Sequence, residues 1–535
     1  MGFPRRELVP YLLLLLALLA FHGRSLGNGF HYDDGHSLLR NPHVRSLREL
    51  PSFFTDAHTF SADPGYAMYR PLVVASHALN YALGGYGARG YLALNLAVHC
   101  LASLVAFHLL GQLGLAWVPA LVGALLFGLH PAQTEVVNYV SARSESLAGL
   151  FVLGGFSAFL HSLTAAVRWR WLALSLLAFT LGLLCKSTTL VLPLLLLLHH
   201  LLFRPSRPWR DHLPYWALAA LYVLLYVALS GQGLERASQV RDFAAQFATQ
   251  AKALGHYLLL TVVPVHLNIQ QQFFVSASPL ELVPVLGALL FTTLALVAWR
   301  GANRQLLFAL GWFLLCLLPT LVVPLNILVN DHRLYLSLFG LALMAAGWVD
   351  GTSRRWPVWA GLALFGVLCC QRAGVWRDEI SLWSAAARQA PRMAEAQYNL
   401  GYAFHQAGDL EHARQAYERA VALSPAYVRA QVNLGAVYRQ QGELPKAEAA
   451  FRRALAVEPG QVEALNNLGL VYAGGGQYTA AIGLYQQALE RAPDQADIWL
   501  NLGLALRDSG QPQPAAEALS RAIQLDPSIR QRFAP

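Results

Sequence analysis

Charged residues are scarce in this sequence of 535 residues. They make up 13% of it, whereas a soluble globular protein has about 25%. With 56% hydrophobic residues, this deficit excludes a disordered protein and argues strongly against a soluble one. Lysine is rarest: only Lys186, Lys252 and Lys446 stand among 39 basic residues. Arginine replaces it throughout, a usage that indicates a GC-rich bacterial gene.

Cysteine is also rare, and the five present lie in or beside apolar runs. They predict neither a disulfide framework nor a C-x-x-C metal site. The sequence also lacks the H-E-x-x-H and Walker A motifs, so it does not resemble the enzymes that use them. Basic residues do not alternate with aromatic ones, and we therefore predict no nucleic-acid partner. The cysteines are Cys100, Cys185, Cys316, Cys369 and Cys370.

The excess of basic over acidic residues is confined to the N-terminal part. Residues 376–535 hold 15 basic and 16 acidic side chains, and residues 1–375 hold 24 and 14. The N-terminal arginines cluster between apolar runs, which is typical of cytoplasmic loops of membrane proteins. The clusters are Arg5-Arg6, Arg168/Arg170, Arg204/Arg207/Arg210, Arg300/Arg304 and Arg354-Arg355.

Eleven apolar runs approach the length of a bilayer-spanning helix. With the N-terminus inside, every arginine cluster falls on the cytoplasmic face, and residues 376–535 lie outside. The shorter segments 72–84 and 251–266 are predicted to lie at the outer interface. The first run could instead be a cleaved signal peptide, since its apolar core, Leu8 to Phe21, is short. The predicted spans are 8–26, 90–112, 115–132, 144–165, 170–185, 187–203, 214–230, 281–299, 305–324, 334–350 and 356–373.

The C-terminal part repeats itself every 34 residues. Asn-Leu-Gly recurs at this interval, followed by glycine, alanine and aromatic positions and a closing proline. This is the tetratricopeptide (TPR) pattern. It predicts a leading helix at 377–390 and repeats at 394–427, 428–461, 462–495 and 496–529.

The sequence thus predicts an all-α protein with two domains. Residues 1–375 form a polytopic helical membrane domain with a large external loop at 27–71, and residues 376–535 form an α-solenoid. Stacked TPR helices create a concave groove, which we expect to bind a protein acceptor or an envelope partner rather than to serve only as a scaffold. The candidate partner-binding residues recur once per repeat: Asn399, Asn433, Asn467 and Asn501.

Four polar segments converge on the predicted outer face. Ionisable groups at a membrane edge are costly unless paired or wetted, so they are candidates for function. The segments contain Asp33, Asp34 and Arg70 in the external loop; His130 and Glu135, running on to Arg143 and Glu145; Lys186; and Asp331, His332 and Arg333.

The carboxylates and cations of these segments suggest one reaction. Adjacent carboxylates suit a general base acting on a hydroxyl, or a divalent metal. Guanidinium and ammonium groups hold phosphates. Together they fit sugar transfer from a polyprenyl-phosphate donor to an external acceptor. Each residue also has a structural alternative: Asp33-Asp34 as a turn and helix cap, Glu135 as a cap, Arg143 as an interfacial anchor, Lys186 as a snorkelling side chain, and His332-Arg333 as a structural pair.

These motifs resemble those of the transmembrane and tetratricopeptide-repeat (TMTC-type) protein O-mannosyltransferases, of the glycosyltransferase C superfamily. The resemblance covers nearly the whole chain. It is carried by Phe30 to Asp34 with Asn41, Tyr69-Arg70-Pro71-Leu72, Asn80-Tyr81 with Gly84-Gly85, Asn95 and His99, His130-Pro131 with Thr134-Glu135-Val136, Arg143 with Glu145, Lys186, Arg333 with Tyr335, and Trp376-Arg377-Asp378-Glu379.

The resemblance implies that Asp33 or Asp34 deprotonates the acceptor hydroxyl, which attacks the sugar with inversion. Glu135 would belong to the catalytic set, and Arg70, Arg143, Lys186, His332 and Arg333 would hold the donor phosphate. The sugar would be mannose or another hexose, and a divalent metal could bind Asp33 and Asp34. The site would face the periplasm in a bacterium or the lumen of the endoplasmic reticulum in a eukaryote.

The sequence departs from the family pattern in three places. Lys186-Ser187 replaces Lys-Glu, His332-Arg333 replaces Glu-Arg, and four full repeats replace a longer array. Two other functions remain open. One is a non-enzymatic membrane scaffold that assembles envelope proteins, and the other is a transferase or ligase acting on lipid-linked polysaccharide.

Overall fold

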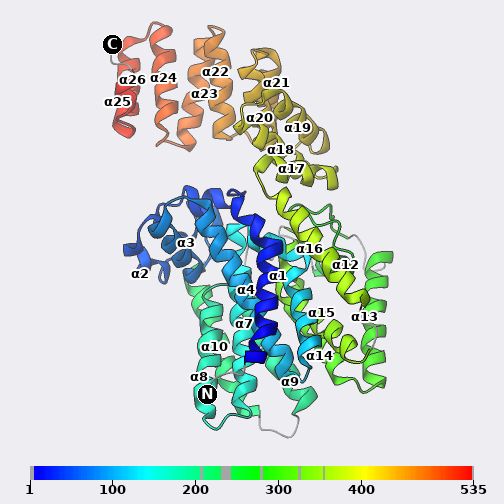
Figure 1. The fold of residues 1–535 in the computed structure, drawn as a ribbon. Coiled ribbons are helices and arrows are strands. Elements are labelled where there is room, and N and C mark those ends of the chain that lie inside the picture. The colour runs from blue at the N-terminus through cyan, green and yellow to red at the C-terminus, as the bar shows by residue number, and fades with distance from the viewer. Residues whose placement is uncertain are drawn as a thin grey trace. The chain divides into compact units, whose positions relative to one another are not determined.

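The computed structural model describes residues 5–204, 209–230, 243–276, 281–322, 327–352 and 356–532. Within these ranges all regular structure is helical and no strand occurs, which confirms the all-α prediction (Figure 1). The chain divides into two compact units, Met1–Leu382 and Trp383–Pro535. Arg207, Arg354, Arg355 and the end of the predicted span 305–324 lie outside the described residues.

A helix lies over each of the eleven predicted spans. The shorter segments are helical as well: α3 (Pro71–Gly84) covers 72–84, and α12 (Phe243–Val262) begins eight residues before 251. The eleven helices are α1 (Arg5–His22), α4 (Ala88–Gln112), α5 (Trp117–Leu129), α7 (Arg143–Ser162), α8 (Arg168–Leu183), α9 (Val191–Phe203), α10 (Leu213–Ser230), α13 (Leu282–Arg300), α14 (Arg304–Val322), α15 (Leu334–Asp350) and α16 (Trp356–Val375).

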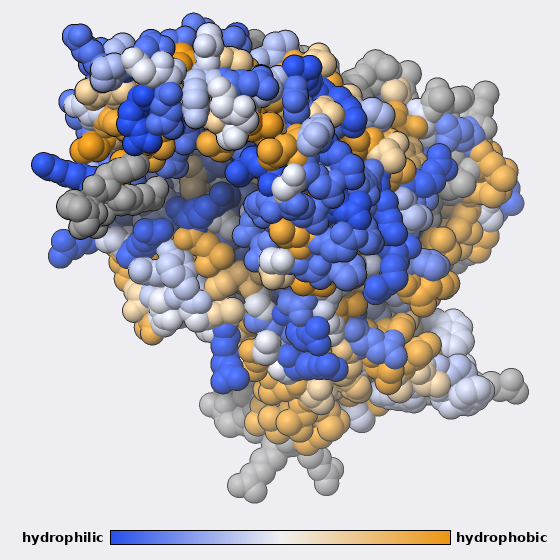
Figure 2. Space-filling view, turned by 90° about the horizontal axis from the view of Figure 1, so that it is seen from above, coloured by the Kyte–Doolittle hydropathy of each residue, from blue (hydrophilic) through white to orange (hydrophobic). Residues whose placement is uncertain are grey.

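The first unit has the helices of a multi-pass membrane protein. Five helices in the described ranges are long and apolar enough to cross a bilayer, and α5 with the segment 131–138 makes a sixth if this bent pair is one span. Three further apolar helices are shorter. The number of eleven spans therefore stays a prediction. Large apolar side chains are exposed, such as Leu83 and Trp299, and Figure 2 shows orange apolar patches beside blue polar areas.

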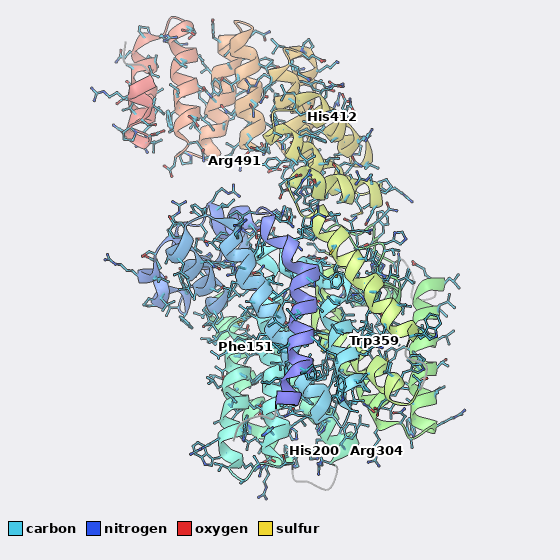
Figure 3. All side chains as sticks on the ribbon, viewed as in Figure 1. Phe151, His200, Arg304, Trp359, His412 and Arg491 are labelled. Atoms are coloured by element: carbon cyan, nitrogen blue, oxygen red, sulfur yellow. The ribbon has the colours of Figure 1, made fainter. Side chains whose placement is uncertain are left out.

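Arginines of the described clusters lie at helix ends in this unit. Arg168 begins α8 and forms an ion pair with Asp211 in η10 (Trp209–His212). His200 of α9 and Arg304 of α14 lie at one end of the unit (Figure 3). The segment between α1 and α4 occupies the other end (Figure 1). Which end faces the cytoplasm stays a prediction.

The predicted external loop is a folded cap with its own core. It contains short helices and turns: η1 (Gly23–Gly27), η2 (Gly35–Leu39), η3 (His43–Arg45), η4 (Leu47–Glu49), α2 (Leu50–Phe53), η5 (Ala57–Phe60) and η6 (Pro64–Tyr66). Buried apolar side chains, including Leu38, Val44 and Phe53, pack against Tyr91 of α4. Apolar burial of this kind stabilises a segment that few regular hydrogen bonds hold. The cap therefore positions the residues that it carries.

A polar network joins helices inside the first unit. Nε2 of His22 and Nε2 of His99 lie 2.9 and 3.0 Å from the carbonyl oxygen of Gly128. Nδ1 of His99 lies 3.1 Å from the Tyr335 hydroxyl. Tyr335 fits because Gly149 of α7 has no side chain; a Cβ there would lie 2.5 Å from the Tyr335 ring.

The second unit is a stack of helix pairs, beginning within α17 (Glu379–Gln389). The first helices of the repeats are α18 (Ala394–Gln406), α20 (Val428–Gln440), α22 (Val462–Gly474) and α24 (Ala496–Asp508). The second helices are α19 (Leu410–Leu423), α21 (Leu444–Val457), α23 (Tyr478–Arg491) and α25 (Pro512–Leu525), and α26 (Ile529–Arg532) follows. The TPR solenoid predicted from the 34-residue period is confirmed.

The repeated residue types have repeated physical roles. Gly401 and its equivalents face the aromatic or leucine position of the second helix, where a Cβ would lie within 2.5–2.7 Å of that side chain. Gly408, Gly442, Gly476 and Gly510 join the two helices with φ between 75° and 81°, a conformation that favours glycine. Each second helix ends two residues before its proline, which cannot continue the hydrogen-bond ladder.

Candidate functional site

Asp33 and Asp34 lie in a tight turn between η1 and η2. Tyr32, just before them, has a φ of 45°, a left-handed conformation that is uncommon for a residue other than glycine. The N–H of Asp34 donates to the carbonyl of His31 at 2.9 Å, and the N–H of Gly35 donates to that of Tyr32 at 3.1 Å. The turn therefore fixes the directions of the two carboxylates.

The Asp34 carboxylate points into the protein. It is fully buried and accepts hydrogen bonds from the backbone N–H and hydroxyl of Ser141, at 2.8 and 2.6 Å, and from the N–H of His31, at 3.0 Å. Ser141 lies in η8 (Val140–Ala142). Burial raises the pKa of Asp34 to about 6, although these hydrogen bonds oppose the shift. Asp34 thus ties the cap to the segment that precedes α7.

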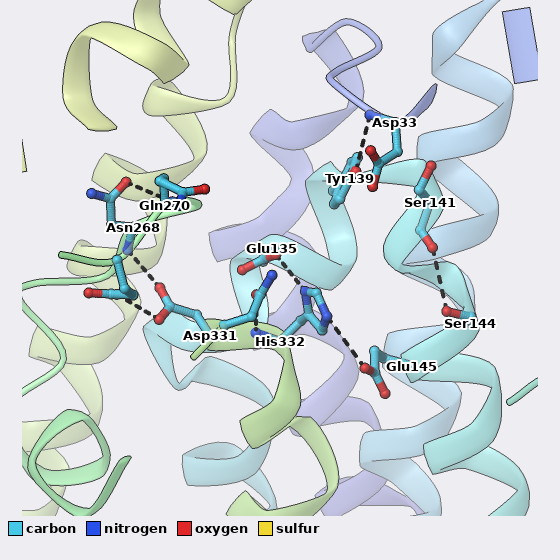
Figure 4. Close-up of polar contacts among 12 residues, drawn as sticks. Asp33, Glu135, Tyr139, Ser141, Ser144, Glu145, Asn268, Gln270, Asp331 and His332 are labelled. Carbon is cyan, nitrogen blue, oxygen red and sulfur yellow. Dashed lines mark hydrogen bonds and ion pairs between the residues drawn. The ribbon is translucent and has the colours of Figure 1, made fainter. Parts of the chain in front are cut away.

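The Asp33 carboxylate has a different environment, because its side chain is 41% exposed. The N–H of Asp33 donates to the Tyr139 hydroxyl at 3.2 Å, and the same phenol hydrogen-bonds the Asp33 side chain. Burial first, and the charges of both aspartates next, hold the pKa of Tyr139 well above its ordinary value. Tyr139 is therefore a neutral phenol that can donate to Asp33 (Figure 4).

Four ionisable side chains from distant parts of the sequence form a chain of contacts, and Figure 4 shows three of them, Glu135, His332 and Glu145. Glu135 of α6 (Thr134–Asn138) places Oε1 2.7 Å from Nδ1 of His332, in η11 (Asp331–Arg333). Nε2 of His332 lies 3.6 Å from Oε1 of Glu145, which also pairs with Lys186. Burial lowers the pKa of Lys186 to about 8, and Glu145 opposes this shift. Oε2 of Glu135 is buried and has no hydrogen-bond partner in the described part of the chain.

Arg70 interacts electrostatically with carboxylates of both groups. It immediately precedes α3 and donates from Nη1 to the Ser144 hydroxyl at 3.3 Å. Its electrostatic partners include Glu145, the strongest, and Asp33. Because both acids attract the same guanidinium, Arg70 links the aspartate turn to the contacts of Glu145.

Two of the predicted phosphate ligands, Arg143 and Arg333, donate to acceptors of the protein, and their role in donor binding stays a prediction. Arg143 is fully buried and donates to the Asn95 amide oxygen, the Ser76 hydroxyl and the Tyr91 carbonyl, at 2.7, 2.9 and 3.0 Å. Arg333 donates to the backbone carbonyls of Leu328 and Ile327, at 3.0 and 2.8 Å. Both guanidinium groups therefore have structural contacts that hold neighbouring backbone and side chains in place.

Asp331 and Arg372 add a further charged centre. Asp331 is buried and accepts from the N–H of Asn268 at 2.7 Å and from the Gln271 amide at 2.8 Å. Arg372, in the last turn of α16, interacts electrostatically with Asp331 and Glu135. Arg372, Tyr139 and Ser141 were absent from the sequence prediction. Its position just after the apolar run 356–370 was the sequence signal that could have identified Arg372.

The aspartate pair does not fit a two-carboxylate metal site. Both oxygens of Asp34 already accept hydrogen bonds from the protein, so only Asp33 could offer a ligand. In the described ranges, no group of three or more His, Cys, Asp or Glu side chains is arranged to hold a metal ion. We therefore derive no step through a metal.

The four asparagines of the repeats lie on the first helices of their units and do not form one cluster. Asn433 donates to the Tyr398 hydroxyl at 3.2 Å, Asn467 to the Glu463 carbonyl at 2.8 Å, and Asn501 to the Asn466 side chain at 2.9 Å. The Asn399 Nδ2 is buried and has no hydrogen-bond partner among the residues described. Whether these side chains bind a partner stays a prediction.

Comparison with known proteins finds relatives over most of the chain. It is 24% identical to protein O-mannosyl-transferase F38B6.6 of Caenorhabditis elegans over 78% of its length, covering 63% of that protein. It is 25% identical to protein O-mannosyl-transferase Tmtc3 of Drosophila melanogaster, again over 78% of the chain, covering 56% of the relative. A 180-residue stretch is 29% identical to protein O-mannosyl-transferase TMTC3 of Homo sapiens and covers 20% of it. The chain thus spans at most 63% of these relatives.

The repeats match family models as well. The "TPR repeat" model matches residues 401–442, and the "Tetratricopeptide repeat" model matches 432–494 and 466–528. A crystal structure of MamA is similar to 28% of this chain and 89% of MamA, at 23% identity and a TM-score of 0.27. The chain is therefore a multi-pass membrane homologue of the TMTC-type protein O-mannosyltransferases with a TPR domain.

Proposed function

We propose that the chain is a membrane glycosyltransferase. It transfers mannose or another hexose from a polyprenyl-phosphate donor to a protein hydroxyl on the extracytoplasmic face. The observation that carries the proposal is the contrast between the two aspartates: Asp34 is buried and hydrogen-bonded, whereas Asp33 is 41% exposed beside Arg70 and Tyr139. The relatives named protein O-mannosyl-transferases support the type of reaction.

Asp33 is the general base in this proposal. Its carboxylate takes the proton of the acceptor hydroxyl while the acceptor oxygen forms a bond to the anomeric carbon. The bond between that carbon and the phosphate oxygen breaks on the opposite face, the leaving polyprenyl phosphate keeps the electron pair, and the configuration inverts. Arg70 and Lys186 bind the phosphate oxygens. Glu145, Glu135 and His332 hold Lys186 in place, and Asp34 holds the turn.

Arg143 and Arg333 have no donor contact in this proposal, because protein acceptors already bind their guanidinium groups. Arg143 ties α7 to α3 and α4, and Arg333 holds the segment before α15. The TPR groove binds the acceptor protein or another envelope partner, since a solenoid presents an extended concave surface.

A transfer assay with the purified full chain tests the proposal. With a labelled polyprenyl-phosphate sugar and exported proteins as acceptors, we expect Asp33→Asn to lose at least about 100-fold in kcat. Glu49→Gln, an exposed acid of the same cap, is the matched control and should retain the rate. Activity unchanged in Asp33→Asn would overturn the assignment. Label found on lipid-linked polysaccharide would favour a ligase. If Asp33→Asn had no effect while substitutions in the TPR groove abolished the protein's function, a scaffold would be favoured.

A further inference from the structure

The segment from Trp376 to Glu379, which leads from α16 into α17, contacts the turn that carries Asp33. Its residues have no role in the proposed reaction. Both ends of the segment face the turn: Glu379 contacts its backbone and an adjacent histidine, and Trp376 stacks on the tyrosine that holds Asp33. The two sets of contacts join residues more than 200 positions apart in the sequence.

Glu379 binds the turn directly. Its Oε1 accepts the backbone N–H of Tyr32 at 3.0 Å and lies 3.1 Å from Nδ1 of His31. Nε2 of the buried His31 lies 2.7 Å from the Trp376 carbonyl oxygen. Each ring nitrogen of His31 thus faces an oxygen of this segment, and Glu379 contacts two consecutive residues of the turn.

Trp376 also supports the turn. Its ring is fully buried and stacks on Tyr139, with 5.7 Å between centroids and an interplanar angle of 25°. Tyr139 in turn accepts the N–H of Asp33. The segment therefore contacts residues 31 and 32 through Glu379 and fixes the partner of Asp33 through Trp376.

The backbone conformation of Tyr32 explains why such support is needed. A φ of 45° costs free energy for a residue with a Cβ and persists where surrounding contacts over-determine it. The hydrogen bond from the Tyr32 N–H to a carboxylate is charge-assisted and stronger than a neutral one. Loss of the carboxylate would let Tyr32 relax and would move Asp33, its neighbour in the chain.

We propose that Glu379 is a positioning residue, which holds the turn at Tyr32 in the conformation that aims the Asp33 carboxylate at the acceptor hydroxyl. The catalytic effect of Glu379 rests on the proposed function, whereas its effect on the turn does not. Glu379 is also the first residue of α17, so the chain anchors the catalytic turn immediately ahead of the repeats.

The test compares Glu379→Ala and Glu379→Gln in the full chain. Glutamine keeps an oxygen that can accept from Tyr32, and alanine does not. We expect Glu379→Ala to lose about 10- to 100-fold in kcat, because small displacements of a reacting group have effects of this size. The KM for the donor should stay within about twofold of the wild-type value, because the donor ligands Arg70 and Lys186 lie outside the turn. Glu379→Gln should recover most of the rate. Glu411→Gln, an exposed first-turn acid of α19, is the control.

Hydrogen exchange of the 30–37 peptide tests the same contact without any activity. Glu379→Ala should speed exchange in this peptide while peptides of α7 stay unchanged; if that variant does not fold, Glu379→Asp, whose carboxylate is one methylene shorter, replaces it. Unchanged exchange and unchanged kcat would overturn the inference, as would a change in donor KM alone. If the wild type transfers no sugar but exchange responds to Glu379→Ala, the proposed function fails and the positioning contact stands.

Discussion

The Asp34 carboxylate accepts two hydrogen bonds from Ser141, a residue 107 positions further along the chain. The two residues join the cap to the segment before α7. Asp33, the immediate neighbour of Asp34, contacts Tyr139 and His36 instead, and its side chain is partly exposed. The two carboxylates of one short motif therefore have different physical roles.

This burial predicts how stability depends on pH. The folded-state pKa of Asp34 is raised from 3.8 to about 6, so the fold favours the protonated acid. The resulting stabilisation is fully present below about pH 3.8 and is lost as the pH rises through about 6. Asp34→Asn cannot ionise and keeps an acceptor for Ser141. We expect the free energy of unfolding of Asp34→Asn, relative to that of the wild type, to rise between pH 4 and 7 by about 3 kcal/mol at most. Above pH 7 the difference should stay constant.

Thermal unfolding in detergent across this pH range measures the difference. Asp63→Asn serves as the control, because Asp63 is an exposed residue of the same cap that also accepts a backbone N–H. A difference between Asp34→Asn and the wild type that does not vary with pH would contradict the assignment.

Lys186 predicts a pH limit for donor binding. Burial lowers its pKa to about 8, with Glu145 opposing and Arg70 and Arg333 adding to the shift. Lys186 is charged below this pH and neutral above it, so binding of a short-chain polyprenyl monophosphate should weaken as the pH rises from 7 to 9. Lys186→Arg keeps its charge and should extend binding to higher pH. Lys252→Arg in α12 is the control. If donor binding weakened around the same alkaline pH in the wild type, Lys186→Arg and Lys252→Arg, Lys186 would be excluded as a ligand.

Sequence patterns predicted the helices well because each depends on a local period. The 34-residue interval of glycine, alanine and proline placed every repeat helix, and the apolar runs placed the membrane helices. The contacts of the site depend instead on long-range packing. Nothing local distinguishes Asp33 from Asp34, because Ser141 decides which of them is buried. Arg143 was expected to hold phosphate, and only the positions of Asn95, Ser76 and Tyr91 show where its donors point.

Arg143→Lys should destabilise the first unit. A guanidinium reaches three separate acceptors in one plane, whereas one ammonium group cannot span them. Unsatisfied buried acceptors and a poorly paired buried cation cost about 2–4 kcal/mol. Arg45→Lys is the control, because Arg45 is exposed and its bond to the Tyr86 hydroxyl lies at the surface; surface changes of this kind alter stability by about 0.5 kcal/mol. Equal melting temperatures for the two variants would show that Arg143 does not hold α3 and α4 against α7.

Two glycines of α7 offer a matched test of helix packing. A Cβ at Gly149 would lie 2.5 Å from the Tyr335 ring, whereas a Cβ at Gly154 would meet nothing within 4 Å. Gly149→Ala should therefore destabilise the first unit by about 1–3 kcal/mol and disturb the contact between Tyr335 and His99. Gly154→Ala should be neutral or stabilising by up to about 1 kcal/mol, because alanine is the better helix former. Thermal unfolding of both variants measures the difference, and a Gly149→Ala protein as stable as Gly154→Ala would show that α7 and α15 do not approach so closely.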